Sequence, residues 1–461
     1  GLAARENYRS VEHLKRYTTL GMATDQGKTS NVNGIATLAA VTGRDPAQIG
    51  VTTFRPPYAP VSFATIVGRE RGELYAPVRR LPAEQTHRDE GAWLTEYGGI
   101  LRPAWYGPDR SAIATECLAA RNGVSVFDGS PLGKIEVIGP DAAALLDFVF
   151  YTRMSSLPVG RLRYGLMLTE GGVIFDDGVV LRLAPDRFVV SCSSSHVAAV
   201  HASLEEWRQD RFDIKRVFIH DTTAHWGTIA IAGPKSRTLV SQLGLGVDLA
   251  DDRLPHMAML AGAFSGAPAR VSRVSFIGER SYEISVPADK AGDLWQRARK
   301  LGAVPQGVEA LSLLRAEKGF IIVGVDTDGE SMPHDIGMGG PRDKRTDAYA
   351  GDRSLMLPVA SQAGRKQLVG IAAEGEAAIP VGAHGVDVAA GRRSIGYITS
   401  SGVSPTLGRP VALALIADGR ARMGQDIVFE HLGSPLAAAG RWSGRVVEPC
   451  FLDPKGERLH A

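Results

Sequence analysis

The sequence predicts an α+β protein of more than one domain that ends in a small β-barrel. Three observations lead to this prediction: a strand, Gly-Pro, helix pattern that occurs twice, two strand-like runs that carry acids, and a final stretch of short strands and turns. At 461 residues the chain also exceeds what one hydrophobic core usually supports. We therefore expect three parts, over residues 1–100, 101–365 and 366–461.

The composition is that of an ordinary globular protein. Lys plus Arg number 52 against 50 Asp plus Glu, and the basic residues are scattered, which argues against nucleic acid or a membrane surface as a partner. No apolar run approaches the roughly 20 residues of a membrane span. The three cysteines form no CxxC pair and the eleven histidines no HxH or HxxxH cluster, so a disulfide framework and metal catalysis are disfavoured. We expect the protein to reside in a reducing cytoplasm.

Residues 1–100 are rich in turn formers and show little periodicity, so we expect them to lie over another domain or subunit. The chain begins without Met, a basic n-region or an apolar h-region, so we expect a cut edge of something longer and not a signal peptide.

The Gly-rich loop at residues 21–29 resembles a phosphate loop without matching one. Five residues separate its glycines where the motif needs four, and no apolar strand precedes it, so a nucleoside triphosphate is not expected. The N–H donors of the loop, together with Lys28, Thr29 and nearby Arg55, suit a single phosphate such as that of a flavin.

The middle part begins the repeated pattern at residues 132–138, whose alternation predicts a strand. Gly139-Pro140 then turns the chain, and Asp141 can cap a helix over 142–149.

The same design returns with a strand at 229–232, Gly233-Pro234 and a helix at 237–243, which indicates an internal duplication. A polar, Gly-rich stretch at 326–352 separates this part from the predicted barrel.

Adjacent acids, Asp176 and Asp177, occur in a strand-like run where an unpaired carboxylate would be costly to bury. On a period of two, Asp177 shares the inward face with Phe175 and Val179. Asp176 is expected to be a solvated hairpin residue or a salt-bridge partner of Arg182. Asp177 is therefore the stronger candidate for a site.

A second acidic, strand-like run at residues 273–284 places Glu283 on one face and its neighbours Tyr282 and Ile284 on the other. Arg315 ends an apolar helix, and it is either part of a polar pocket with the two acids or a structural ion-pair partner. Residues 191–196 combine serines with a histidine but lack the GxSxG elbow, so a strand that turns into a helix cap is favoured over a nucleophile.

Seven motifs occur in a fixed order along the chain: residues 124–128, 139–140, 171–180, 233–234, 278–283, 314–317 and 396–408. Together they resemble the folate-binding aminomethyltransferases of the glycine-cleavage type, over roughly residues 100–461. The resemblance implies a three-lobed folate-binding aminomethyltransferase fold with a C-terminal β-barrel.

Residues 9–19, 22–31, 53–58 and 315–328 narrow the resemblance to the alpha subunits of heterotetrameric sarcosine oxidases. In that family an NAD-binding half precedes this region, so the chain resembles the carboxyl-terminal half, made separately or cleaved. The resemblance implies FMN at the interface with a flavin-bearing beta-type subunit, smaller gamma- and delta-type subunits, and FAD and NAD in other parts of the complex.

The resemblance also implies residue roles. Asp177 matches the residue that manages a proton while tetrahydrofolate traps a one-carbon unit from an N-methyl amine as 5,10-methylenetetrahydrofolate. Glu283 matches the acceptor of two pterin hydrogen bonds, Arg315 would support the pterin or the acids, and Phe276 and Tyr282 would form an apolar wall. A stand-alone aminomethyltransferase and a non-catalytic assembly or flavin-covering module are the alternatives.

Overall fold

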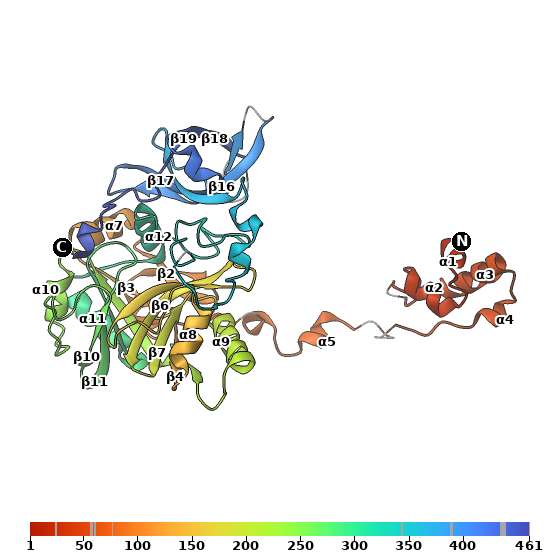
Figure 1. Cartoon of the computed structure of the whole chain (residues 1–461), viewed down its shortest axis with the longest axis horizontal. Coiled ribbons are helices and arrows are strands. Elements are labelled where there is room, and N and C mark those ends of the chain that lie inside the picture. The colour runs from red at the N-terminus through yellow and green to blue at the C-terminus, as the bar shows by residue number, and fades with distance from the viewer. Residues whose placement is uncertain are drawn as a thin grey trace. The chain divides into compact units, whose positions relative to one another are not determined.

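The computed structural model describes residues 1–23, 25–55, 59, 61–75, 77–342, 344–387, 391–433 and 439–460. Contacts divide the chain into two compact units, Gly1–Pro77 and Val78–Ala461 (Figure 1). The first unit ends before residue 100, because α6 (Glu84–Asp89) already belongs to the second, where His87 is hydrogen-bonded to Asp128 at 2.9 Å. No helix of these described residues is long and apolar enough to cross a membrane.

The first unit has a small core of its own, which the turn-rich sequence did not lead us to expect. Val11, Leu38, Ala39 and Ile49 are buried together and come from three different helices. The helices of this unit are α1 (Leu2–Arg5), α2 (Val11–Tyr17), α3 (Asn31–Thr42), α4 (Pro46–Ile49), α5 (Phe63–Val67) and the short η1 (Gly72–Leu74).

The larger unit contains two sheets with matching strand orders, which supports the predicted duplication. One order is β5-β6-β7-β4-β8 and the other is β10-β11-β12-β9-β3-β13. The first copy comprises β4 (Gly133–Ile138), α8 (Ala142–Val149), β5 (Leu162–Leu168), β6 (Ile174–Ala184), β7 (Arg187–Cys192), α9 (Val197–Arg211) and β8 (Phe218–Asp221). The second comprises β9 (Trp226–Ala232), α10 (Ser236–Ser241), β10 (Ala258–Phe264), β11 (Ala267–Arg273), β12 (Ser281–Pro287) and α11 (Ala291–Lys300), with β3 (Ser125–Asp128) and β13 (Val304–Pro305) along one edge.

The two Gly-Pro turns share one backbone device. Gly139 has φ +127° and Gly233 has φ +122°, and a Cβ at these positions would lie 2.2 Å and 2.5 Å from backbone carbonyl oxygens. Glycine is therefore required where each strand turns into its helix. Asp141 does occupy the N-cap of α8, but its carboxylate makes no cap bond and instead accepts from Arg216 at 2.8 Å.

Helices cover one face of each sheet, and the other two faces lie against each other. α8 and α9 pack on one sheet, and α10 and α11 on the other, each around its own apolar cluster. Between the sheets, Glu136 of β4 pairs with Arg270 of β11 at 3.0 Å, and Leu181 of β6 packs with Met257 and Met259. The space between the two sheets is thus partly polar.

The final strands close a barrel, which confirms the predicted architecture. They are β14 (Lys366–Ala373), β15 (His384–Asp387), β16 (Arg393–Ser404), β17 (Arg409–Ala417), β18 (Asp426–His431) and β19 (Gly440–Val447), and β14 pairs with both β17 and β19. The barrel lies above α7 (Ala112–Asn122) and α12 (Val308–Glu317) in Figure 1.

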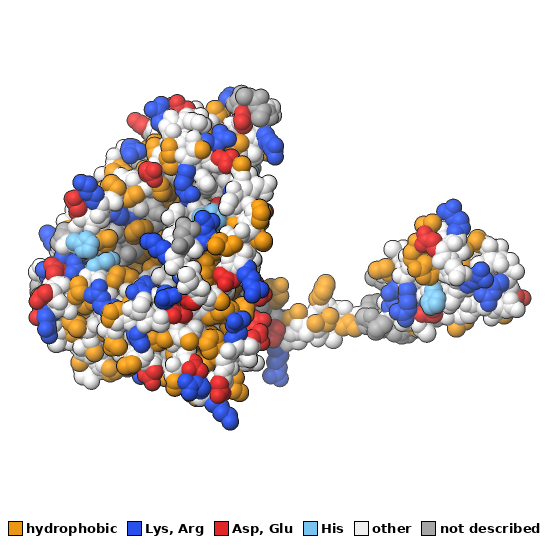
Figure 2. All heavy atoms as spheres, viewed as in Figure 1, with side chains coloured by type: hydrophobic (Ala, Val, Ile, Leu, Met, Phe, Trp, Pro, Cys, Tyr) orange, Lys and Arg blue, Asp and Glu red, His pale blue; other side chains and the backbone are white. Residues whose placement is uncertain are grey.

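The remaining elements are β1 (Ala92–Tyr97), β2 (Ile100–Tyr106), α13 (Glu457–His460) and the short helices η2 (Thr223–His225), η3 (Ala288–Lys290), η4 (Ser354–Met356), η5 (Pro358–Ser361) and η6 (Gly419–Arg422). On the face of the larger unit seen in Figure 2, Lys and Arg side chains are interspersed with Asp and Glu.

Candidate functional site

Asp177 lies on β6 with its side chain on the face that meets the other sheet. It shares this face with Val179 and Leu181, so it points inward as the alternation predicts. The hydroxyl of Tyr164, on neighbouring β5, donates to Asp177 Oδ2 at 2.8 Å. Burial raises the pKa of Asp177 to about 6, although the bond from Tyr164 lowers it. Tyr164 carries no signal of this role in the sequence, because the pairing of β5 with β6 is needed to bring it here.

Asp176 is fully buried, so the prediction of a solvated residue or a partner of Arg182 is wrong. Its carboxylate accepts from Ser193, from the backbone N–H at 3.1 Å and from the hydroxyl at 2.6 Å. Arg182 donates to backbone carbonyls instead. The register of β5 with β6 shifts at Phe175, which packs on the helix-covered side. Asp176 thereby ties β6 to the end of β7.

Residues 191–196 form the end of β7 and the turn into α9, as predicted. His196 occupies the N-cap position of α9, and its Nδ1 atom is 3.9 Å from Asp176 Oδ1. The hydroxyl of Ser193 donates to Asp176 and not to the histidine, so the segment holds no activated nucleophile.

Glu283 on β12 is half-buried and faces the space between the sheets. No hydrogen bond to its carboxylate is found among the described residues. Burial raises its pKa to about 7, while the positive charge of Lys134 acts to lower it. Among the described residues Glu283 is therefore a carboxylate without a hydrogen-bond partner.

Lys134 on β4 comes from the opposite sheet and is buried. Its ammonium donates to the backbone carbonyls of Ser130 at 3.0 Å and Leu132 at 2.8 Å. Burial lowers its pKa to about 8, while Asp128 and Glu283 act to raise it. Lys134 was not predicted as a site residue, since alternation in residues 132–138 reveals a polar face but not the second sheet that covers it.

The two predicted wall residues lie in different places. Tyr282 is fully buried in the apolar core on the helix-covered face of β12, opposite to Glu283, so the structure does not support its role as a wall beside this acid. Phe276 is an exposed residue in the otherwise mostly buried loop between β11 and β12, and its ring stacks on Phe320 at a centroid distance of 6.4 Å. Only Phe276 remains a candidate for this role.

Arg315 is buried where α12 meets the barrel. It forms an ion pair with Asp326 and donates to Ser400 Oγ at 2.6 Å and to the Phe320 carbonyl at 3.0 Å. Neither Asp177 nor Glu283 bonds to it in the described part of the chain. The structure therefore favours the structural ion-pair reading that the sequence left open.

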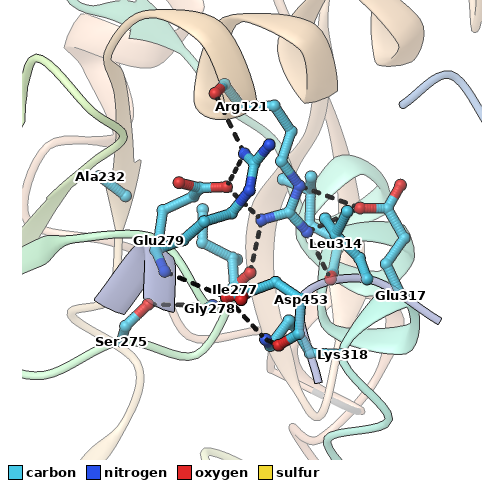
Figure 3. A network of polar contacts seen from close by, with 12 residues as sticks. Arg121, Ala232, Ser275, Ile277, Gly278, Glu279, Leu314, Glu317, Lys318 and Asp453 are labelled. Carbon is cyan, nitrogen blue, oxygen red and sulfur yellow. Dashed lines mark hydrogen bonds and ion pairs between the residues drawn. The ribbon is translucent and has the colours of Figure 1, made fainter. Parts of the chain in front are cut away.

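A second set of charges lies next to it, and we call Arg121, Glu279, Glu317, Lys318, Asp453 and Arg458 the junction cluster. All of them except Arg458, which is partly exposed, are labelled in Figure 3. Arg121 donates to Glu279 at 2.9 Å, to Glu317 at 2.6 and 3.0 Å, and to the carbonyls of Ile277 and Leu314. The other Glu317 oxygen accepts from Ser404 on the barrel at 2.5 Å. The cluster thus joins α7, α12, the 274–280 loop and the barrel.

The flavin candidates of the first unit are partly engaged already. Thr29 donates from its backbone N–H and its hydroxyl to Asp25 Oδ2, at 3.2 and 2.6 Å, so an acid occupies the donors expected for a phosphate. Arg55 donates to the Lys15 carbonyl at 3.0 Å. Its Nε atom is buried without a hydrogen-bond partner among the described residues. Of the motif residues named from this segment, Thr24 and residues 56–58 lie outside the described residues.

A cavity of about 450 Å³ opens elsewhere, beside the first barrel strand. The charges that line it pair with one another, Lys366 with Asp328 and Arg365 with Asp335, and none of the predicted site residues lines it. No group of His, Cys, Asp and Glu that could hold a metal ion occurs among the described residues. The facing surfaces of the two sheets therefore hold the best candidate site, because pKa values raised toward neutrality by burial are typical of functional carboxylates.

Comparison with known proteins agrees with this fold. The GCVT N-terminal domain model matches residues 83–341, the Glycine cleavage T-protein C-terminal barrel domain matches 366–453, and the Sarcosine oxidase A3 domain matches 1–69. The crystal structure of glycine cleavage system aminomethyltransferase T from Bartonella henselae aligns with a TM-score of 0.71 at 23% identity, over 82% of this chain and 99% of that one. The chain belongs to the family of the GCVT N-terminal domain.

Within this family the chain matches the carboxyl-terminal portion of sarcosine oxidase alpha subunits. It is 42% identical to the sarcosine oxidase subunit alpha of Corynebacterium sp. (strain P-1), over 97% of this chain and 47% of that protein. It is also 33% identical to the aminomethyltransferase of Streptomyces avermitilis, over 77% of this chain and 94% of that protein. The chain spans about half the length of the alpha subunits that it matches.

Proposed function

We propose that this chain is the folate-binding part of a cytoplasmic sarcosine oxidase-type complex. In this role it passes the one-carbon unit from oxidative demethylation of an N-methyl amine to tetrahydrofolate. The similarity over 97% of the chain to a sarcosine oxidase alpha subunit supports the type of complex. The observation that carries the chemistry is Asp177, an inward carboxylate with a raised pKa on the face between the sheets.

Asp177 is suited to take up a proton near neutral pH. With a pKa of about 6 it is mostly ionised at pH 7, yet it is basic enough to accept a proton from an amine nitrogen as a new bond forms. Tyr164 holds one of its oxygens by a bond of 2.8 Å, which orients the carboxylate and leaves the other oxygen for the ligand. When bound, tetrahydrofolate would supply the two nitrogens between which the one-carbon unit is held as 5,10-methylenetetrahydrofolate.

Glu283 fits the recognition of the pterin ring. Its carboxylate has no hydrogen-bond donor among the described residues, and a carboxylate can accept two bonds from adjacent N–H groups. An orphan acceptor beside a buried lysine is a costly arrangement unless a ligand completes it. Phe276, on the loop that leads into β12, would stack against the bound ring.

The N-terminal unit would meet the flavin and the partner subunits. FMN would lie at the interface with a flavin-bearing beta-type subunit, with gamma- and delta-type subunits, FAD and an NAD-binding half elsewhere in the complex. Lys28 and Arg55 would lie near the flavin, whereas Thr29 would first have to exchange its bonds to Asp25. The match of residues 1–69 to the Sarcosine oxidase A3 domain supports this placement.

A stand-alone aminomethyltransferase is the second candidate, since 94% of the Streptomyces avermitilis enzyme aligns with this chain. Purification of the native complex separates the two functions. A yellow complex with a flavin-bearing subunit that forms methylenetetrahydrofolate from an N-methyl amine supports the first. A flavin-free chain that exchanges one-carbon units with tetrahydrofolate supports the second. Absence of folate binding, measured by fluorescence quenching, would contradict both and favour a non-catalytic module.

A further inference from the structure

Lys134 and Glu283 leave complementary hydrogen-bonding capacity open between the two sheets. An ammonium carries three donors, and Lys134 uses two of them on the carbonyls of Ser130 and Leu132. Its third donor has no hydrogen-bond partner among the described residues, and the carboxylate of Glu283 accepts no hydrogen bond there. No ion pair within 4.0 Å joins the two groups among the described residues, although each acts on the charge of the other.

Small residues stand beside both groups in the strand registers. Glu283 is paired with Ser272 of β11 and Ala230 of β9, and Lys134 is paired with Ser191 of β7. Short side chains therefore flank the long Lys and the long Glu on their neighbouring strands.

Asp128 does not require Lys134 as its partner. Its carboxylate is already bonded to the His87 ring at 2.9 Å and accepts from the Ser130 backbone N–H at 2.8 Å. Lys134 is therefore not needed to neutralise an otherwise unpaired acid at this position. Its free donor is better explained by a ligand that lies toward Glu283.

We propose that Lys134 and Glu283 together read one edge of the bound ring, with Lys134 donating to a ring carbonyl and Glu283 accepting from the N–H and amino groups beside it. This inference rests on the proposed function, because a pterin carries that order of groups, the 4-oxo oxygen, the N3–H and the 2-amino group, along one edge. Lys134 is thus a specificity-determining residue that distinguishes an oxo group from an amino group at this position of the ring.

Folic acid and aminopterin test this assignment, because aminopterin carries an amino group in place of the 4-oxo group and, when neutral, no hydrogen on N3. The effect of changing Lys134 on the difference between the two ligands is therefore the quantity to compare. Binding of each to the 461-residue chain is measured by quenching of tryptophan fluorescence. The unmodified chain should prefer folic acid. Lys134→Met should weaken folic acid by about tenfold or more, the scale of a hydrogen bond to a charged group, and should weaken aminopterin much less. Glu283→Gln should weaken both ligands.

Controls separate recognition from folding. Lys134→Arg keeps the positive charge and should keep the preference, and Lys300→Met, at an exposed lysine, should change neither affinity. Circular dichroism and thermal unfolding check each variant, and Lys134→Gln replaces Lys134→Met if the latter does not fold.

If Lys134→Met lowers the affinity for both ligands equally, or lowers neither, the preference is unchanged. That result would overturn the role of Lys134 and leave the proposed function standing. A well-folded unmodified chain that binds neither ligand would overturn the proposed function and this inference together. If the preference for folic acid over aminopterin is lost in Lys134→Met or Lys134→Gln but kept in Lys134→Arg, the result supports both the proposed function and the role of Lys134.

Discussion

At the barrel junction each of the five N–H donors of Arg121 has a partner, whereas between the sheets the carboxylate of Glu283 accepts no hydrogen bond in the described part of the chain. Both regions bury charge, and both draw their residues from segments far apart in the sequence. Paired charges hold α7, α12 and the barrel together. Buried charges whose hydrogen-bonding groups lack partners are costly to the folded chain and are expected where a ligand binds. The same comparison predicts opposite effects of mutation on stability and on activity.

The largest expected effect is on activity, at Asp177. Asp177→Asn in the assembled complex should leave amine oxidation intact and lower methylenetetrahydrofolate formation by about a hundredfold or more, since a positioned proton acceptor contributes on that scale. Free formaldehyde should rise correspondingly. Both products are measured in one assay, and the melting temperature should not fall. Loss of amine oxidation in a well-folded variant would count against this division of roles.

The next effect is on stability, at the junction cluster. Arg121→Met leaves Glu317 buried without its cation, so the free energy of unfolding should fall by about 3–5 kcal/mol while folic acid affinity stays unchanged. The double variant Arg121→Met with Glu317→Gln should recover much of this loss, because the orphan charge is gone. Denaturant unfolding measures both. A weaker folic acid affinity in the folded single variant would show that the two regions are coupled.

Removal of the Glu283 charge should raise the stability of the folded chain, whereas removal of Arg121 lowers it, and the effect at Glu283 should depend on pH. Its pKa is raised from 4.5 to about 7 in the folded state, so the folded chain binds more protons than the unfolded chain between these values. Stability contributed by this group is thus lost as pH rises through that window. Glu283→Gln should remove this slope and be more stable than the unmodified chain at pH 8 by about 2 kcal/mol, but not at pH 4.

Thermal unfolding from pH 4 to pH 8 measures the effect of Glu283, and Glu376→Gln, at an exposed position, serves as the matched control. A parallel pH profile for Glu283→Gln and the unmodified chain would mean that Glu283 is ionised without cost and has a partner in solution.

A smaller effect is expected at Asp176, whose bonds to Ser193 are structural. Asp176→Asn keeps one acceptor oxygen and should cost about 1–2 kcal/mol of unfolding free energy, with nearly normal folic acid binding. Ser193→Ala should give a similar loss. An affinity loss that matches that of Glu283→Gln would show that the catalytic carboxylate has been assigned to the wrong residue.

The smallest effect on the larger unit is expected from removal of residues 1–60. Each unit has its own core, so the melting of the larger unit and its affinity for folic acid should change little. Partner association should weaken and the flavin absorbance should change. Normal assembly with an unchanged flavin spectrum would mean that Lys28 and Arg55 do not contact the flavin.

The two halves of the larger unit show which features local sequence patterns can predict. Alternation and the Gly-Pro turns predicted β4 and β9 and their helices, because side-chain period and positive φ are local properties. They could not predict that β4 has a second sheet on its polar face. For the same reason Lys134 was overlooked and Asp176 was assigned to solvent.

By itself the sequence determined the α+β class, the duplicated units, the barrel and the inward direction of Asp177, all of which follow from residue patterns within a few positions. The tertiary structure alone decided which buried charges are paired. At the junction Arg315 pairs with Asp326, and Glu317 pairs with Arg121 and accepts from Ser404. Tyr282 lies in the apolar core. Lys134 and Glu283 are 149 positions apart, and each acts on the charge of the other without a direct ion pair among the described residues. Pairing between distant segments depends on how the sheets and the barrel pack, and no local period carries that information.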